Sequence, residues 1–322
     1  MIRFPRMPGC WEAIGRRLAE AALVLGLAVV LAFAMARLMP GDPATVMMDG
    51  QGTDPALVRR LWGAGELDLP LWRQFVDYLT GLPGGDFGLS WRYAGMPVTT
   101  LIGEAAPVTL LLVVATLTVA VPAGIAAGIA SAHRPGTWLD GALTVGAVLA
   151  LSMPPVVLAT WLMLATPGRL VVSLAGDWLG DLAGLMAPVA ALAIAPIGIV
   201  ARSTRAQLLE VLGHDYVRCA RAKGLSALRV MIGHALPNAM VGVWAVVGTL
   251  AGAILTSTAV VETVFNLPGL GRLAIEAVLA RDYPVAGAVV LVFVLVQVTI
   301  SLAVDLLIVA IAPTDRDTLD QP

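Results

Sequence analysis

Six long apolar stretches constrain the fold of this chain more than any other feature. A helix needs about 20 apolar residues to cross about 30 Å of hydrocarbon. The stretches lie at roughly residues 18–39, 105–130, 138–166, 185–201, 239–261 and 284–312. Because they are continuous rather than short and alternating, they favour helices over the strands of a membrane barrel. The sequence therefore predicts an all-α membrane protein with six transmembrane helices.

The composition excludes an ordinary soluble domain. Of the 322 residues, 58% are hydrophobic and 13% are charged, whereas soluble domains carry about 25% charged residues. The formal net charge of −2 indicates no nucleic-acid partner. The single lysine, Lys223, precedes Gly224 rather than Ser or Thr, so the sequence lacks a phosphate-binding loop. Work driven by ATP would therefore require a separate ATPase subunit.

The distribution of basic residues predicts the orientation in the membrane. The loop 202–238 holds six Lys and Arg residues against two acids, and the region before the first span is also basic. Basic residues are enriched in cytoplasmic loops. We therefore expect a cytoplasmic N-terminus and first helix (1–39), an extracytoplasmic loop (40–104), a membrane core (105–312) and a cytoplasmic tail (313–322).

The outer loop 40–104 is too long to be a simple connection. Asp54-Pro55 predicts a helix start, and Pro70 predicts the start of a second, amphipathic helix with Phe75 and Tyr78 on its apolar face. This loop is either a small cap with its own core or a docking surface. The sequence leaves both interpretations open.

Two membrane positions could influence a path through the protein. Pro154-Pro155 predicts a kink in the third span, because proline frees backbone groups that need other partners. A kinked helix can line a path or belong to a passive bundle. Glu262 ends the fifth span at the outer border, where we expect a wetted carboxylate at a gate or a structural turn.

The segment 215–224 predicts a short helix in the basic loop. Asp215 suits the N-cap, Lys223 suits the last turn, and Gly224 suits the left-handed position after the helix. Tyr216, Cys219, Ala220 and Lys223 fall on one face at helical spacing. From these residues alone, a helix that binds a partner and a solvated basic loop are equally good interpretations.

The same segment resembles the EAA loop of ABC-importer permeases. That pattern reads Glu-Ala-Ala, three residues, Gly, nine residues, Ile-x-Leu-Pro. With Gly224 fixing the register, Arg218-Cys219-Ala220 occupies the Glu-Ala-Ala place, and the sequence His-Ala-Leu-Pro at 234–237 occupies the second. The run Asp-Tyr-Val-Arg-Cys-Ala-Arg-Ala-Lys-Gly at 215–224 also resembles the peptide-permease version, with Cys219 in place of Thr.

Further motifs extend the resemblance over nearly the whole chain. They are Pro-Gly-Asp-Pro at 40–43, Leu-Asp-Leu-Pro at 67–70, Gly-Asp-Phe-Gly at 85–88, the run from Val261 to Gly271, and Arg-Asp-Tyr-Pro at 281–284. The chain resembles the B-type permease subunit of dipeptide, oligopeptide and nickel ABC importers. It departs from that pattern at 312–316 and has no recognisable motif at 167–184.

The resemblance implies a type I ABC-importer permease fold and a transporter subunit that is not an enzyme. It implies a second homologous permease, two ATP-binding subunits, an extracytoplasmic solute-binding protein and a peptide substrate, in the lipid of a bacterial cytoplasmic membrane. ATP is used by the partner subunits, and this chain binds no cofactor. The implied coupling helix contains Asp215, Tyr216, Arg218, Cys219, Ala220, Lys223 and Gly224, of which Tyr216, Ala220 and Gly224 should fit the ATPase. The candidate gate or path residues are Glu262, Asn266 and Pro154.

Other functions fit the sequence less well. Nickel or a metal chelate is the alternative substrate within the same class, and a proton-coupled secondary carrier is the alternative from another class. A carrier would favour titratable groups at mid-membrane and an internal repeat. The three histidines, His133, His214 and His234, lack metal-ligand spacing, and no serine has a histidine nearby in a span, so no metal or catalytic site is expected.

Overall fold

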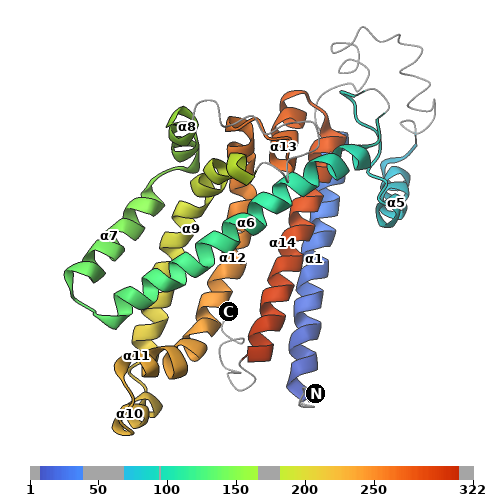
Figure 1. The fold of residues 1–322 in the computed structure, drawn as a ribbon. Coiled ribbons are helices and arrows are strands. Elements are labelled where there is room, and N and C mark those ends of the chain that lie inside the picture. The colour runs from blue at the N-terminus through green and yellow to red at the C-terminus, as the bar shows by residue number, and fades with distance from the viewer. Residues whose placement is uncertain (1–7, 39–68, 94–95, 166–181, 312–322) are drawn as a thin grey trace. The chain divides into compact units, whose positions relative to one another are not determined.

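The computed structural model describes residues 8–38, 69–93, 96–165 and 182–311 (Figure 1). Within these ranges the chain is helical, with one isolated β-bridge between Leu89 and Pro97. Five helices are long and apolar enough to cross a membrane, or six when the bent pair α7 and α8 is counted as one span. This confirms the predicted all-α membrane fold.

The described residues form the following helices in chain order. They are α1 (Pro8–Leu38), α5 (Leu71–Gly81), η1 (Leu82–Gly84), α6 (Val98–His133), α7 (Trp138–Ser152), α8 (Pro155–Ala165), α9 (Leu182–Val211), α10 (Asp215–Ala222), α11 (Ala227–Val230), the π-helical turn η2 (Met231–Ala235), α12 (Leu236–Val264), α13 (Leu270–Leu279) and α14 (Tyr283–Ile311). The helices α9 and α12 extend beyond their apolar stretches, so helix occupies both ends of the predicted loop 202–238. Backbone hydrogen bonds continue a helix past the membrane whatever the polarity of its side chains.

Several sequence-based expectations lie outside the described residues. They are the helix start at Asp54, the tail 313–322, and most of the stretch 167–184. The second predicted outer helix is present: α5 begins at Leu71, directly after Pro70, and ends at Gly81.

The chain divides into two compact units, and each is described here by itself. Unit 1 comprises residues up to Pro107 and Pro268–Thr299, and therefore contains α1, α5, η1 and α13 with the first part of α6 and most of α14. Its α1 packs closely on α14, because a Cβ added at Gly287 would lie 3.2 Å from the carbonyl oxygen of Ala32. Small residues permit this approach of two membrane helices.

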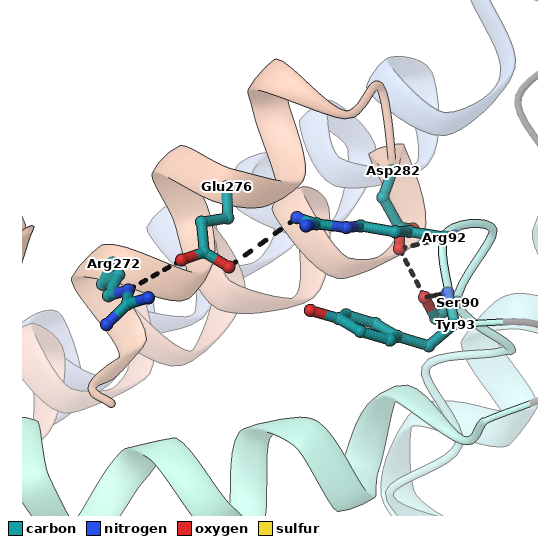
Figure 2. A network of polar contacts seen from close by, with 6 residues as sticks. All are labelled: Ser90, Arg92, Tyr93, Arg272, Glu276 and Asp282. Carbon is teal, nitrogen blue, oxygen red and sulfur yellow. Dashed lines mark hydrogen bonds and ion pairs between the residues drawn. The ribbon is translucent and has the colours of Figure 1, made fainter. Parts of the chain in front are cut away.

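A buried carboxylate joins sequence-distant segments of unit 1. Asp282 is 1% exposed and accepts hydrogen bonds from the Ser90 hydroxyl, from the Trp91 amide at 3.1 Å and from the Arg92 amide at 3.2 Å. Figure 2 shows Asp282 facing Ser90, with Glu276 of α13 between Arg272 and Arg92. These contacts fix the loop before α6 against the loop before α14.

Unit 2 comprises Val108–Leu267 and the chain from Ile300 onward, and α9 lies at its centre. Glycine allows α6 to approach α9: a Cβ at Gly128 would lie 2.5 Å from the Thr204 Cβ and 2.7 Å from the Ala201 carbonyl oxygen. On another side of α9, a Cβ at Gly198 would lie 2.9 Å from the Ala147 carbonyl oxygen of α7. Membrane helices gain van der Waals contact in this way, since lipid provides no hydrophobic driving force between them.

The third span is sharply bent. Helix α7 ends at Ser152, α8 begins at Pro155, and the two axes differ by 94°. Pro155 disfavours helical backbone at the residue before it, which is Pro154. Helix α8 has 11 residues and covers only about 16 Å, so it does not cross the membrane alone. The predicted kink is therefore a break in the span.

In unit 2, an ion pair joins α7 to α9 near the turn between α6 and α7. Asp140 is 5% exposed and accepts two hydrogen bonds from Arg205 of α9, at 2.7 Å from Nε and 2.8 Å from Nη2. The Ser131 hydroxyl and the Gly136 amide also donate to this carboxylate. The arrangement satisfies Asp140 from three segments, as a buried charge requires.

The contact between α6 and α9 predicts a stability effect. Gly128→Ala should destabilise the protein by about 1–3 kcal/mol, because the added methyl group collides with backbone as well as with Thr204. Thermal unfolding in detergent measures the change. The matched control is Gly103→Ala on the same helix, where a Cβ meets nothing within 4 Å. Equal melting temperatures for the two variants would contradict the proposed role of this contact.

Candidate functional site

The short helix α10 is held on unit 2 by a small apolar core. Val217 is fully buried and Ala220 is 5% exposed, and both contact Val230 at the end of α11. Leu212 and Leu225 cover the cluster from the two flanking turns. Figure 1 shows α10 and α11 at the end of α9 opposite α8. The helix is therefore a packed projection of the bundle rather than a free loop.

The two ends of α10 match the prediction in part. His214 is the N-cap residue, and Asp215 lies in the first turn with its carboxylate 3.4 Å from Arg218 Nη1, so the prediction that Asp215 caps the helix is wrong. Its charge still suits the positive end of the helix dipole. The prediction for Gly224 is confirmed by its φ of +81°, whereas Lys223 is the C-cap residue and the basic residue of the last turn is Arg221.

The structure revises which face of α10 points outward. The face proposed from the sequence includes Ala220, but this residue is buried against Val217 and Val230. At 100° per residue, burying Val217 and Ala220 leaves the opposite face exposed; it carries Asp215, Arg218, Cys219 and Ala222. Sequence spacing shows which residues share a face, but the packing of Val217 decides which face is covered.

Tyr216 lies at the edge of that face and joins α10 to α12. Asn238 Nδ2 donates a hydrogen bond to Tyr216 Oη at 2.7 Å and another to the carbonyl oxygen of His234 at 3.1 Å. The rings of Tyr216 and His214 also meet edge to face, with centroids 5.9 Å apart. Sequence reasoning missed Asn238. Its position directly after Pro237, at the start of a helix, was the available signal.

The exposed surface around α10 combines apolar and basic groups. Tyr216, Leu228 and Ile232 are between 41% and 50% exposed. The basic side chains beside them are Arg218, Arg221, Lys223 and Arg229. Aromatic and arginine side chains are enriched in protein interfaces. Among the described residues no group of three or more His, Cys, Asp or Glu side chains is placed to hold a metal ion. The surface suits protein contact.

The second candidate region is the end of α12. Glu262 is fully buried, which corrects the expectation of a wetted carboxylate, and Thr109 Oγ1 of α6 donates to its Oε1 at 2.6 Å. Asn266 has a φ of +54°, and the Leu267 amide donates to the Glu262 carbonyl at 2.8 Å. This is a Schellman ending, in which asparagine often takes the left-handed position. Asn266 therefore has a structural role in ending α12.

Pro154, the third candidate position, is exposed at the break between α7 and α8. Its carbonyl accepts the Val157 and Leu158 amides, which begin α8. The structure thus places Pro154, Glu262 and the α10 surface within unit 2, at separate positions.

Comparisons with known proteins identify a consistent set of relatives. A family model described as "Binding-protein-dependent transport system inner membrane component" matches residues 120–316. The dipeptide transport system permease protein DppB of Lactococcus lactis is 33% identical over 301 residues, which cover 94% of this chain and 98% of that one. The DppB protein of Bacillus subtilis is 36% identical over 272 residues, which cover 84% and 87%.

A solved structure shares the fold. An inward-facing conformation of the MetNI methionine ABC transporter matches with a TM-score of 0.51 and 19% sequence identity. The match covers 66% of this chain and 95% of that chain. At this identity the likeness concerns the fold alone.

The packing of α10 predicts a local stability effect. Ala220→Leu should loosen α10, because the larger side chain overfills the cluster around Val217 and Val230. Hydrogen exchange of the α10 amides should accelerate by about tenfold, which corresponds to about 1.4 kcal/mol of local opening free energy. Ala222→Leu adds the same atoms at an exposed position and should leave exchange unchanged. Unchanged exchange in Ala220→Leu would mean that this cluster does not hold α10.

Proposed function

The chain belongs to the family of binding-protein-dependent transport system inner membrane components, and we propose that it is a permease subunit of an ATP-driven ABC importer for di- or oligopeptides. It forms half of the translocation pathway, and a second homologous permease forms the other half. Two ATP-binding subunits and an extracytoplasmic solute-binding protein complete the transporter. The observation that carries the proposal is the similarity to the dipeptide permease of Lactococcus lactis over 94% of this chain.

The α10 surface supports docking of an ATPase subunit. Its outward face offers small side chains at Cys219 and Ala222, which allow a groove to approach the helix backbone closely. Arg218 and the neighbouring basic residues favour an acidic groove. Tyr216 and Gly224 lie beside this face, whereas Ala220 acts from inside by holding the helix in place.

A displacement of α10 can be transmitted to the membrane helices because α10 is closely packed and hydrogen-bonded to its neighbours. Val217 and Ala220 are fixed on α11, and Asn238 links Tyr216 to α12. ATP binding shifts the arrangement of the bundle only when the ATPase contacts α10 differently in the two states. In this mechanism ATP-driven closure of the ATPase pair moves α10, and α10 moves α9 and α12.

The charge distribution supports the orientation that this mechanism requires. The loop with α10 and α11 carries six Lys and Arg residues between 202 and 238, which supports a cytoplasmic location. Both termini lie on the same side of a bacterial cytoplasmic membrane, and the segment 40–104 faces outward. The coupling helix is then on the side where ATP is available.

Two further positions contribute to the path in this proposal. The Glu262–Thr109 contact joins the end of α12 to α6 at the outer border and serves as a latch of the closed gate. The break at Pro154 gives the third span two segments whose backbone ends can line the pathway. Nickel as an alternative cargo gains no support from relatives that are named for dipeptides.

Transport by the reconstituted complex tests the function. In proteoliposomes with the ATPases, the second permease and the binding protein, labelled dipeptides should accumulate and stimulate ATP hydrolysis. Cys219→Trp should reduce uptake at least about tenfold, because about 1.4 kcal/mol of lost docking free energy suffices for that change. Hydrolysis that no longer responds to peptide would mark uncoupling.

Matched variants make the test specific. Arg134→Trp adds the same ring at an exposed turn outside α10 and should transport normally. Normal uptake by Cys219→Trp would refute the docking face. Absence of peptide uptake by the wild-type complex, with intact ATP hydrolysis, would refute the peptide assignment.

The proposed latch predicts altered basal hydrolysis. Glu262→Ala removes the acceptor for Thr109 and should raise ATP hydrolysis without peptide by about fivefold, which corresponds to one hydrogen bond of about 1 kcal/mol. The assay is hydrolysis by the reconstituted complex. Thr263→Ala, at an exposed position in the same turn, is the control. Basal hydrolysis that stays at the wild-type rate in Glu262→Ala would exclude the latch.

A further inference from the structure

A pocket of about 470 Å³ opens between α7 and α9 within unit 2. None of its lining residues belongs to α10 or to the end of α12. They are Thr144 and Leu151 from α7, and Ile199, Arg202, Ser203, Arg205 and Ala206 from α9. The pocket is therefore separate from the docking surface and from the proposed gate.

The pocket lies at the depth of lipid headgroups. Residues 182–201 of α9 contain no charged side chain, and 20 helical residues cover about 30 Å, the thickness of the hydrocarbon layer. Arg202 follows this stretch directly. At the same end, α7 begins with Trp138, which is 83% exposed, and tryptophan is enriched where membrane meets water.

Polar and apolar groups are separated along the pocket. Arg202, Ser203 and Arg205 lie at the headgroup end. Ile199 lies one helical turn further into the membrane on α9, and Leu151 belongs to the last turn of α7, thirteen residues after Trp138. The lining thus changes from charged to apolar in the same direction as a phospholipid changes from head to acyl chain.

The charges favour an anionic ligand. Asp140 holds the Arg205 guanidinium through Nε and Nη2, which fixes the group while leaving other N–H groups able to donate. Arg202 is exposed, and among the described residues no carboxylate lies within 4.0 Å of it. One arginine is thus pre-oriented and neutralised, and the second supplies an uncompensated positive charge.

We propose that this pocket binds an anionic phospholipid, with its phosphodiester group at Arg202 and Arg205 and an acyl chain along Ile199 and Leu151. Arginine presents N–H groups in a geometry that matches phosphate, and basic pockets between membrane helices take anionic headgroups. A soluble phosphate would leave the apolar half of the pocket without a ligand. A zwitterionic lipid would leave the charge of Arg202 unmatched.

Native mass spectrometry tests the proposal. The full chain is purified in mild detergent with its co-purifying subunits, and retained phosphatidylglycerol is compared with retained phosphatidylcholine. Wild type should retain phosphatidylglycerol in preference, and Arg202→Gln should retain at least about fivefold less. Arg202 has no ion-pair partner in the described chain, so Gln is compatible with the fold, and thermal unfolding verifies this.

Two variants serve as comparisons. Arg134→Gln removes the same charge from an exposed turn at the same end of the helices but outside the pocket, and should retain lipid as wild type does. Thr144→Trp fills the pocket from α7 without a charge change, and should lose lipid as Arg202→Gln does.

Three results would overturn the proposal. They are equal loss of lipid in Arg202→Gln and Arg134→Gln, equal retention of phosphatidylcholine, and displacement of the lipid by millimolar inorganic phosphate. The first would indicate a general surface charge effect, and the last a soluble anion as the ligand. The readout is lipid retention, so a failure of peptide transport would leave this test unaffected.

Discussion

The close approach of helix backbones around α9 is the constraint on which unit 2 depends. Apolar side chains gain little by leaving lipid for the protein interior, so membrane helices must associate through tight packing and a few polar contacts. At Gly128 and Gly198 the neighbouring helix occupies the space that a side chain would need. These contacts set the positions of α6 and α7 against α9. The same packing determines which side chains of α9 remain exposed.

Buried carboxylates, together with glycine packing, hold the segments of each unit in place. Asp282 accepts hydrogen bonds from Ser90 and two backbone amides in unit 1, and Asp140 accepts from Arg205, Ser131 and Gly136 in unit 2. Each carboxylate joins segments that are distant in sequence or separated by a turn. A carboxylate satisfied in this way fixes geometry, because any shift of its partners leaves a buried charge without hydrogen bonds.

The function proposed for α10 also depends on close packing and a polar contact. A short helix of eight residues has little stability of its own. The burial of Val217 and Ala220 and the Tyr216–Asn238 hydrogen bond give it a fixed position on the bundle. A helix held in this way transmits displacement, whereas a solvated loop would absorb it. The packing shows that α10 is a fixed helix rather than a solvated loop, and its binding to an ATPase stays a prediction.

The sequence by itself determined the membrane-spanning class, the helical content, a bend at Pro154-Pro155 and the left-handed residue Gly224, because each depends on local hydrophobicity or local backbone sterics. The motifs at 215–224 and 261–271 also indicated the permease family. Only the tertiary structure decided that Ala220 faces inward, that Glu262 is buried beside Thr109, and that Asp140 pairs with Arg205 across 65 residues. Helical periodicity shows which residues share a face, but it does not show which other segment packs against that face. The partner of a buried group depends on which helices meet, and that depends on packing between segments far apart in the chain.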